Sequence, residues 1–593
     1  MLNKRNPLTA MSFSVSFRVM TIFMAMAITS VFVSAVSDAQ GPSAFISFRE
    51  RDIEYIKDTK VSNEFRLPTD LVPLEYNLSI KTYLPFYVPI PYDRNLTFDG
   101  NVVITIKVMK PTHEIVLNMV NITLKSLECK MISATEIRAV EIKKVIEYPN
   151  LKKISVVLSE TLNENDVVTF KMEYTGLISR SLDGLYQTSY TGKDGRPKIA
   201  AVTQFQPAYA ARLMVSCFDE PLFKANWTVT VIHPNGTSAL SNGIEICEDR
   251  VVTKFATTPA MSSYLLAVFV SEYNYTEGKT KSGVRYRVWS SPHLVNTTQY
   301  ALQAGIVAHE FFEEYFGVGF SLKKQGGVAG DAKYIANNKK NLSKNHLIAI
   351  SSETISNKPL AFDMVAIPQI NSRGMENWGL ITFKETVLLY DEKFVTPSSK
   401  QQTAILVAHQ LAHQWFGNLV TMKWWNDFWL NEGFATMLSY IGANPINEMK
   451  LRMEDYFLVD SFEQGLHADS FTTTHPLSLK VDDILDVKPT LDKISYHKGA
   501  SVLFMIYYLI GEDDFLKGVK HHLEKYSYSN IQTSDLWSSF DEVVGNIKGP
   551  YGRMINMTYF GDQWSFQLCD FIGRFDTIGH RRSFSFFLYH HRF

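Results

Sequence analysis

Two histidines lie four residues apart in an apolar stretch of the sequence. His409 and His413 belong to the run Val407-Ala-His-Gln-Leu-Ala-His-Gln-Trp415, and Pro397 and Ser398 upstream are typical of a helix start. On a helix the two imidazoles are one turn apart and project from the same face, so both can reach one metal ion. Paired histidines at this spacing are also common as purely structural residues, so the pair alone is weak evidence.

A carboxylate in the next helix-like segment strengthens the metal interpretation. Glu432 lies in Trp429-Leu-Asn-Glu-Gly-Phe434, nineteen residues after His413. A catalytic zinc takes three protein ligands and keeps a fourth position open. We therefore expect His409, His413 and Glu432 to hold one Zn²⁺ per chain.

The elements that position these residues change character along the chain. From about Arg66 to Glu272 the sequence is β-branched or alternates with period two, which predicts strands. From about Tyr300 the apolar spacing becomes helical. The clearest strand segments are Tyr76–Ile80, Val102–Val108, Ile154–Leu158, Val167–Tyr174 and Trp227–His233, and the clearest helical ones are Ala301–Tyr315, Ala404–Gly417, Leu430–Gly442 and Gly499–Ile510.

Length and composition indicate a folded protein with more than one domain. The chain has 593 residues, of which 46% are hydrophobic and 20% charged, and its net charge is -1. That balance gives no indication of a nucleic-acid partner. Four cysteines are too few for a disulfide scaffold; one bridge is possible, and the sequence does not determine its pairing.

The first forty residues predict entry into the secretory pathway. Lys4, Arg5 and Arg18 precede an apolar run from Val19 to Val36, after which small residues follow. This order is typical of a cleaved signal peptide, and an uncleaved anchor that attaches the protein to a membrane is the alternative. An extracellular or cell-surface location follows from either. The chain also contains nine N-glycosylation sequons, at Asn77, Asn95, Asn121, Asn226, Asn235, Asn274, Asn296, Asn341 and Asn556.

Several motifs together resemble the gluzincin aminopeptidases of the M1 family, the aminopeptidase N type. The spacing of His409, His413 and Glu432 is similar to that family's zinc pattern. The segments Thr203-Gln-Phe-Gln206, Cys217-Phe-Asp-Glu-Pro221, Arg373-Gly-Met-Glu-Asn377 and Tyr496-His-Lys-Gly499 also match family motifs, in the family's order. The resemblance covers roughly residues 66 to 565. It implies an α+β multidomain fold, with an N-terminal all-β domain followed by a thermolysin-like, mainly helical zinc-peptidase domain.

The resemblance also implies a role for each matched residue. Glu376, helped by Gln206, would bind the free α-amine of a peptide, so that residues are removed singly from the amino end. Tyr496 would donate a hydrogen bond to the oxyanion as it forms. The alternatives are a buried structural carboxylate at Glu376 and a core tyrosine at position 496.

The sequence departs from the family most clearly at Gln410, where the family has glutamate. That glutamate accepts a proton from the attacking water and delivers it to the leaving amine. An amide has nearly the same shape but cannot accept this proton near neutral pH. We therefore expect folding and zinc binding to persist and hydrolysis to fall by about 10²–10⁴-fold.

Other departures cluster around the same site. Arg373 and Gly374 replace a glycine and an alanine, and we expect the cation at 373 to crowd or repel the substrate. Gln369 stands where the family usually has an acid.

The expected organisation is a signal peptide or anchor at 1–37, a linker at 38–65, a β domain at 66–274, a catalytic domain at 275–565 with an insertion at about 323–357, and a divergent tail at 566–593.

Three functions are compatible with these features. The first is a zinc metalloaminopeptidase of weak or no activity that acts on peptide amino termini. The second is a zinc-binding pseudoenzyme that serves as a glycosylated secreted or cell-surface binding protein. The third is a non-functional product of an imperfect gene model, which the insertion and the abrupt end favour. Oligomeric state and residue preference do not follow from the sequence.

Overall fold

The N-terminal half of the chain folds into three β-sheets in a computed structural model. The structure describes residues 54–57, 65–133, 136–206, 210–249, 251–320, 361–393, 396–446, 452–482, 486–487, 490–544 and 554–567. The expected signal peptide, the expected insertion and nearly all of the expected tail lie outside these ranges. They remain predictions.

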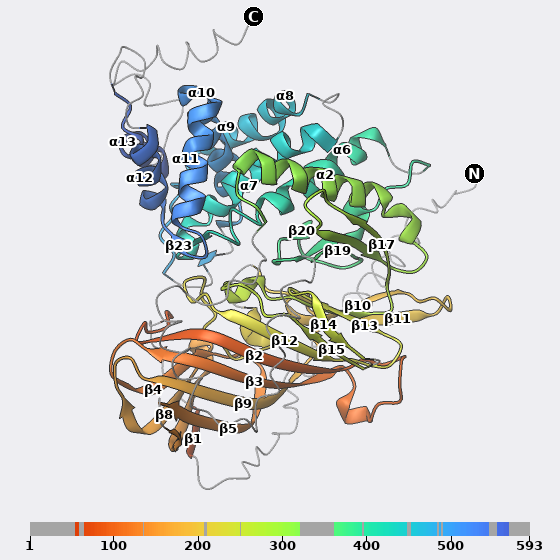
Figure 1. The fold of residues 1–593 in the computed structure, drawn as a ribbon, viewed down its shortest axis with the longest axis vertical. Coiled ribbons are helices and arrows are strands. Elements are labelled where there is room, and N and C mark those ends of the chain that lie inside the picture. The colour runs from red at the N-terminus through yellow and green to blue at the C-terminus, as the bar shows by residue number, and fades with distance from the viewer. Residues whose placement is uncertain are drawn as a thin grey trace, which may run out of the picture. The chain divides into compact units, whose positions relative to one another are not determined.

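The largest sheet has eight strands, and its central strands lie side by side in Figure 1. In β3 every second side chain is buried, which is the pattern expected when one face of a sheet covers a core. This alternation confirms the strand predicted at Val102–Val108. The other four predicted strand segments also lie in strands, except that His233 falls one residue beyond its strand. The order across the sheet is β14 (Glu245–Glu248), β15 (Val252–Phe255), β12 (Asn226–Ile232), β2 (Leu71–Tyr83), β3 (Thr97–Val108), β9 (Val167–Leu177), β5 (Ile122–Ile132) and β6 (Ile137–Val140).

Two four-stranded sheets complete the β region. The first runs β1 (Glu54–Lys57), β7 (Ile142–Tyr148), β8 (Lys153–Leu162) and β4 (Thr112–Asn118). The second runs β10 (Gly184–Thr191), β11 (Pro197–Gln204), β16 (Val268–Ser271) and β13 (Ser238–Ser241). Strand β1 pairs in parallel with β7 and lies within the stretch that the sequence suggests is a linker.

A five-stranded sheet with both parallel and antiparallel strand pairs precedes most of the helices along the chain. Its order is β17 (Asn274–Lys279), β18 (Arg285–Ser290), β19 (Ala361–Ile367), β21 (Leu380–Lys384) and β20 (Gly374–Met375). Strands β18 and β19 are parallel, and helix α2 (Gln299–Phe316) lies between them in the sequence and packs on β17 and β18. The short strand β20 pairs with β21 and leads directly into Glu376.

The remaining elements are mainly helical and lie beside this sheet in Figure 1. Helix α7 (Trp429–Ile446) is buried nearly all round, which is expected of a helix in the centre of a core. The helical segments predicted from apolar spacing are confirmed by α2, α6 (Pro397–Ala412), α7 and α10 (Gly499–Ile510), but α6 ends five residues before the predicted Gly417. The helices are α5 (Glu385–Leu388), α6 (Pro397–Ala412), α7 (Trp429–Ile446), α8 (Met453–Phe457), α9 (Glu463–Asp469), α10 (Gly499–Ile510), α11 (Glu512–Lys525), α12 (Thr533–Val544) and α13 (Met557–Ser565), with π-helical turns at Leu458–Phe462 and Ile494–Lys498 and a two-stranded sheet of β22 (Thr421–Met422) and β23 (Asn530–Ile531).

Within the described ranges, every helix is too short or too polar to serve as a membrane span. Cys129, Cys217 and Cys247 are free thiols, and the first two are buried. No disulfide therefore forms among the described cysteines.

Candidate active site

The three expected zinc ligands meet where helices α6 and α7 approach each other. Helix α6 begins with Pro397 after Thr396, whose hydroxyl accepts the backbone N–H of Ser399. His409 lies in the last turn of α6, and His413 caps its carboxyl end. Glu432 lies in the first turn of α7.

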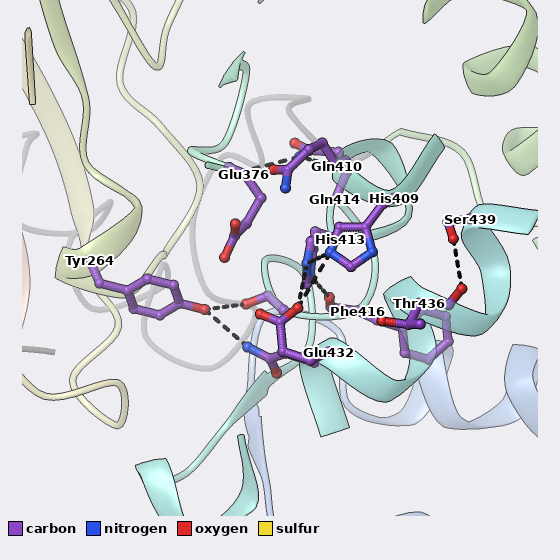
Figure 2. Close-up of polar contacts among 12 residues, drawn as sticks. Tyr264, Glu376, His409, Gln410, His413, Gln414, Phe416, Glu432, Thr436 and Ser439 are labelled. Carbon is purple, nitrogen blue, oxygen red and sulfur yellow. Dashed lines mark hydrogen bonds and ion pairs between the residues drawn. The ribbon is translucent and has the colours of Figure 1, made fainter. Parts of the chain in front are cut away.

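The side chains of these three residues converge on one point (Figure 2). The Nε2 atoms of His409 and His413 are 3.1 Å apart. Glu432 Oε2 is 3.4 Å from Nε2 of His409 and 3.3 Å from Nε2 of His413. The three side chains are almost fully removed from solvent, with exposed fractions of 14%, 1% and 2%.

This donor set fits a tetrahedral zinc ion. Bonds of 2.0–2.2 Å to nitrogen and oxygen would separate the donors of a tetrahedron by about 3.3–3.5 Å, which is close to the three distances above. The carbonyl of Phe416 accepts a hydrogen bond from His413 Nδ1 at 3.0 Å, so the Nε2 lone pair faces the cluster in the neutral ring. Among the described residues, this is the single group of histidine, cysteine and carboxylate side chains close enough to hold a metal.

Burial and charge act against each other in this cluster. Burial favours the neutral form of Glu432, but His413 and His409 lower its pKa to about 2, so the carboxylate is ionised. Burial lowers the pKa of His409. Burial opposes protonation of His413, but Glu432 and Glu376 raise its pKa to about 9. A metal that binds here would therefore displace a proton from His413.

Glu376 follows β20 and is almost completely buried, with 2% exposure. Its backbone carbonyl accepts hydrogen bonds from Asn418 Nδ2 at 2.8 Å and from Gln414 Nε2 at 3.3 Å. Burial raises the pKa of Glu376 to about 7, and His413 and Gln206 oppose that shift. The two bonds hold the backbone of Glu376 in place, and its Oε1 atom has no hydrogen-bond partner among the described residues, so this oxygen is free to accept a donor.

Gln410 lies on α6 between the two histidines and also points towards Glu376 and the ligand cluster (Figure 2). It is 4% exposed, and its Oε1 atom has no partner among the described residues. A Cβ on Gly374 would lie 3.0–3.1 Å from the side chain of Gln410, so glycine at this position leaves room for the amide. Arg373 is exposed and does not line the cavity, which gives no support to the expectation that it crowds the substrate. Its charge contributes to lowering the pKa of His409, so the expected repulsion of the substrate remains a prediction.

Tyr496 lies in the π-helical turn Ile494–Lys498. Its ring stacks on that of His409 with the centroids 6.3 Å apart. Burial, with added repulsion from Glu432 and Glu376, raises the pKa of the phenol well above its ordinary value, so the hydroxyl keeps its proton.

A cavity of about 390 Å³ joins all seven of the residues singled out from the sequence. Two larger hollows, of about 810 and 1100 Å³, lie elsewhere and contain none of these residues. Gln204 and Gly374, which belong to two of the motifs quoted from the sequence, also line the cavity. The further lining residues, which the sequence did not indicate, are Asp183, Ala210, Asn371, Ser372 and Leu491.

A second set of residues holds the site from outside the cavity. Tyr264, from the β region, donates a hydrogen bond to the carbonyl of Gly417 at 3.0 Å and accepts one from Asn431 Nδ2 at 3.2 Å (Figure 2). Lys224 is half-buried and donates to the carbonyls of Asn418 and Leu419. No short motif marks these residues, because their partners lie more than 150 residues away in the sequence.

Comparison with known proteins identifies the family. A model of the peptidase M1 N-terminal domain matches residues 72–265, and a model of the peptidase family M1 domain matches residues 341–564. The chain belongs to peptidase family M1. This confirms both the resemblance and the expected fold class, a β-rich N-terminal domain followed by a mainly helical peptidase domain. The second match begins inside the expected insertion at 323–357.

Known M1 peptidases are similar to this chain over most of its length. Aminopeptidase N of Haemonchus contortus is 48% identical over 511 residues, which are 85% of this chain and 48% of that protein. Endoplasmic reticulum aminopeptidase 1 of Homo sapiens is 33% identical over 497 residues, 83% of this chain and 48% of that protein. Aminopeptidase M1 of Arabidopsis thaliana is 32% identical over 488 residues, 81% of this chain and 50% of that protein. The chain spans about half the length of these relatives.

Proposed function

We propose that this chain is a zinc metalloaminopeptidase whose hydrolytic activity is weak or absent because Gln410 stands in place of the general base. The observation that carries the proposal is the cavity in which Glu376, Tyr496 and the cluster of His409, His413 and Glu432 face one another. The names of the relatives support an action on peptide amino termini.

The ligand cluster would hold the metal. When bound, zinc would act as a Lewis acid that polarises the scissile carbonyl and lowers the pKa of water. The carboxylate of Glu376, buried and with a free oxygen, would pair with the α-ammonium of the peptide, and Gln206 lies beside it in the same cavity. Such a pair fixes the first residue of the peptide and thereby selects the first peptide bond.

Tyr496 would stabilise charge that develops on the peptide carbonyl oxygen. Its raised pKa keeps the phenol protonated and able to donate a hydrogen bond. The proton from the attacking water has no acceptor at position 410, because the amide of Gln410 has no basic form near neutral pH. The substrate can therefore be bound and polarised, while the proton transfer that completes hydrolysis is impaired.

The second candidate is a pseudoenzyme that binds peptide amino termini without cleaving them. The unpaired Oε1 atom of Gln410 favours it, because a buried amide facing the cavity can hydrogen-bond to a peptide backbone.

An extracellular or cell-surface location, with attachment to a membrane or without it, is part of either proposal. Among the described sequons, the exposed asparagines are Asn77, Asn95, Asn121, Asn235, Asn296 and Asn556, and Asn226 already donates its amide to Thr258.

The test is hydrolysis of aminoacyl fluorogenic amides by the purified full chain beside the Gln410→Glu variant, with zinc measured in both. We expect about one zinc per chain and a rate about 10²–10⁴-fold higher in the variant. The exposed Gln532→Glu serves as the matched control and should leave the rate unchanged. A wild type as fast as Gln410→Glu would refute the role assigned to Gln410, and absence of zinc would refute the ligand set. Zinc with no hydrolysis in either protein would favour the pseudoenzyme.

A further inference from the structure

One charged residue in the cavity has no part in the proposed chemistry. The carboxylates that line it are Asp183, Glu376 and Glu432, and among the described residues no lysine or arginine lines it. Glu432 belongs to the ligand cluster, and Glu376 is assigned to the α-amine. Asp183 therefore remains without a function.

Asp183 is held at the cavity wall by hydrogen bonds from the peptidase domain. Asn371 Nδ2 donates to the carbonyl of Leu182 at 3.1 Å and to Asp183 Oδ1 at 3.3 Å. The hydroxyl of Tyr186, three residues further on, donates to the carbonyl of Gln369 at 2.9 Å. These bonds fix the start of β10 against the segment that leads into Gly374 and Glu376.

The negative charge of Asp183 has no positive partner. It is half-buried, and no lysine or arginine of the described chain lies within ion-pair distance of it. Asn371, its hydrogen-bond partner in the described part of the chain, is neutral. A carboxylate in a concave, partly desolvated position binds a cation more strongly than one on an open surface, because water screens the pair less.

Unpaired polar atoms in the same cavity indicate that a polar ligand belongs there. Glu376 Oε1 and Gln410 Oε1 are buried, line the cavity with Asp183 and have no hydrogen-bond partner in the described chain. Buried polar atoms in native proteins are nearly always paired, so these atoms are expected to find their partners in a bound molecule.

We propose that Asp183 binds the cationic side chain of a peptide whose first residue is arginine or lysine, while Glu376 binds the α-ammonium of the same residue. This inference rests on the proposed function and adds a preference for basic amino-terminal residues. Two carboxylates, one for each positive group, make the cavity complementary to a dication. A planar guanidinium can satisfy both oxygens of a carboxylate at once, so arginine is the better of the two ligands.

The test measures the binding of dipeptides to the zinc-loaded full chain by calorimetry. Arg-Ala should bind wild type roughly 10-fold more tightly than citrulline-Ala, which has nearly the same shape without the charge, and more tightly than Leu-Ala. Because this comparison changes only the ligand, it does not depend on whether any variant folds. In Asp183→Asn the ratio between Arg-Ala and citrulline-Ala should fall to about one, with the affinity for Leu-Ala unchanged. The exposed Asp513→Asn is the matched control.

Equal affinities of wild type for Arg-Ala and citrulline-Ala would overturn the inference, as would an unchanged ratio in Asp183→Asn. In both cases Leu-Ala would still bind in a manner that depends on Glu376, so the proposed function would survive. If none of the dipeptides binds the zinc-loaded protein, the proposed function itself fails.

Discussion

Gly417 lies four residues after His413 and has a φ of +126°, a backbone conformation that L side chains rarely adopt. A Cβ at this position would lie 3.2 Å from Nδ1 of His413 and 3.3 Å from the amide nitrogen of Asn431. The first atom donates the hydrogen bond that orients the imidazole, and the second bonds to Tyr264. A single methyl group here would disturb the support of the ligand cluster without touching a ligand atom.

We therefore expect Gly417→Ala to lower the affinity for zinc by about 10–100-fold, the usual effect of losing support behind a metal ligand. Gly195→Ala is the matched control, because Gly195 also has a positive φ of +74° but a Cβ there would meet nothing within 4 Å. A competition titration with a chromophoric chelator measures both variants. Equal zinc affinities for Gly417→Ala and wild type would contradict the support assigned to His413.

At the scale of single residues, the sequence predicts the site residues whose neighbours in the site are also close to them in the chain. His409 and His413 are one helical turn apart, so their convergence follows from helix geometry alone. Asp183 and Tyr264 reach the site only through long-range packing, and nothing in their local sequence marks them. The roles of Gln206, Glu376 and Tyr496 came from family motifs and remain predictions.

At the scale of elements, long periodic segments were predicted well and short ones were not. Helix α10 was expected at Gly499–Ile510 and has those bounds. The π-helical turn that carries Tyr496 was not foreseen, because a change of hydrogen-bond register within a helix leaves no periodic signal. Strands β22 and β23 have two residues each and pair across more than 100 residues of sequence, so pattern reasoning could not find them.

The contact between helices α11 and α12 contains a buried titratable group. His522 Nδ1 lies 2.8 Å from Ser539 Oγ, and both residues are buried. Burial, with added repulsion from His521 and Lys525, lowers the pKa of His522 to about 3. In the unfolded chain the same imidazole would titrate at about 6.5. The unfolded state therefore binds more protons than the folded state between these two values.

It follows that the stabilisation associated with neutral His522 is complete above about pH 6.5 and is lost as the pH falls towards 3. Between pH 6.5 and 5 the expected loss is about 2 kcal/mol in the free energy of unfolding. We expect His522→Gln to lose less stability than wild type over this range, as measured by Tm at pH 7 and pH 5. His467→Gln, at an exposed position of α9, is the control and should retain the pH dependence of wild type. An equally steep dependence in His522→Gln would exclude His522 as its source.

At the scale of the whole molecule, the β region and the peptidase domain are joined at the site itself. Tyr264 and Lys224 bond to carbonyls of residues 417 to 419, which connect the two ligand-bearing helices. Asn242 adds a bond to the carbonyl of Trp378, just after the Glu376 motif. The geometry of the ligands therefore depends on a domain that contributes no ligand.

Zinc should consequently stabilise the whole protein. At free zinc about 1,000-fold above its Kd, the free energy of unfolding should rise by about 4 kcal/mol, and a chelator should reverse this. Tyr264→Phe should lower the Tm of the zinc-free protein, at a cost of about 1–2 kcal/mol, and should also reduce the gain produced by zinc. Tyr559→Phe, at a 70% exposed position, is the matched control. A full zinc effect in Tyr264→Phe would show that the β region does not support the ligands.

The packing of Gln410 against Gly374 has a consequence for the gene. Every glutamine codon becomes a glutamate codon by a change of its first base, and the two side chains are almost equal in size. The space beside Gly374 would therefore receive a carboxylate as readily as it holds the amide. A point mutation in a natural population could supply the missing proton acceptor without any other change in the fold, so alleles of this locus are worth sequencing at codon 410.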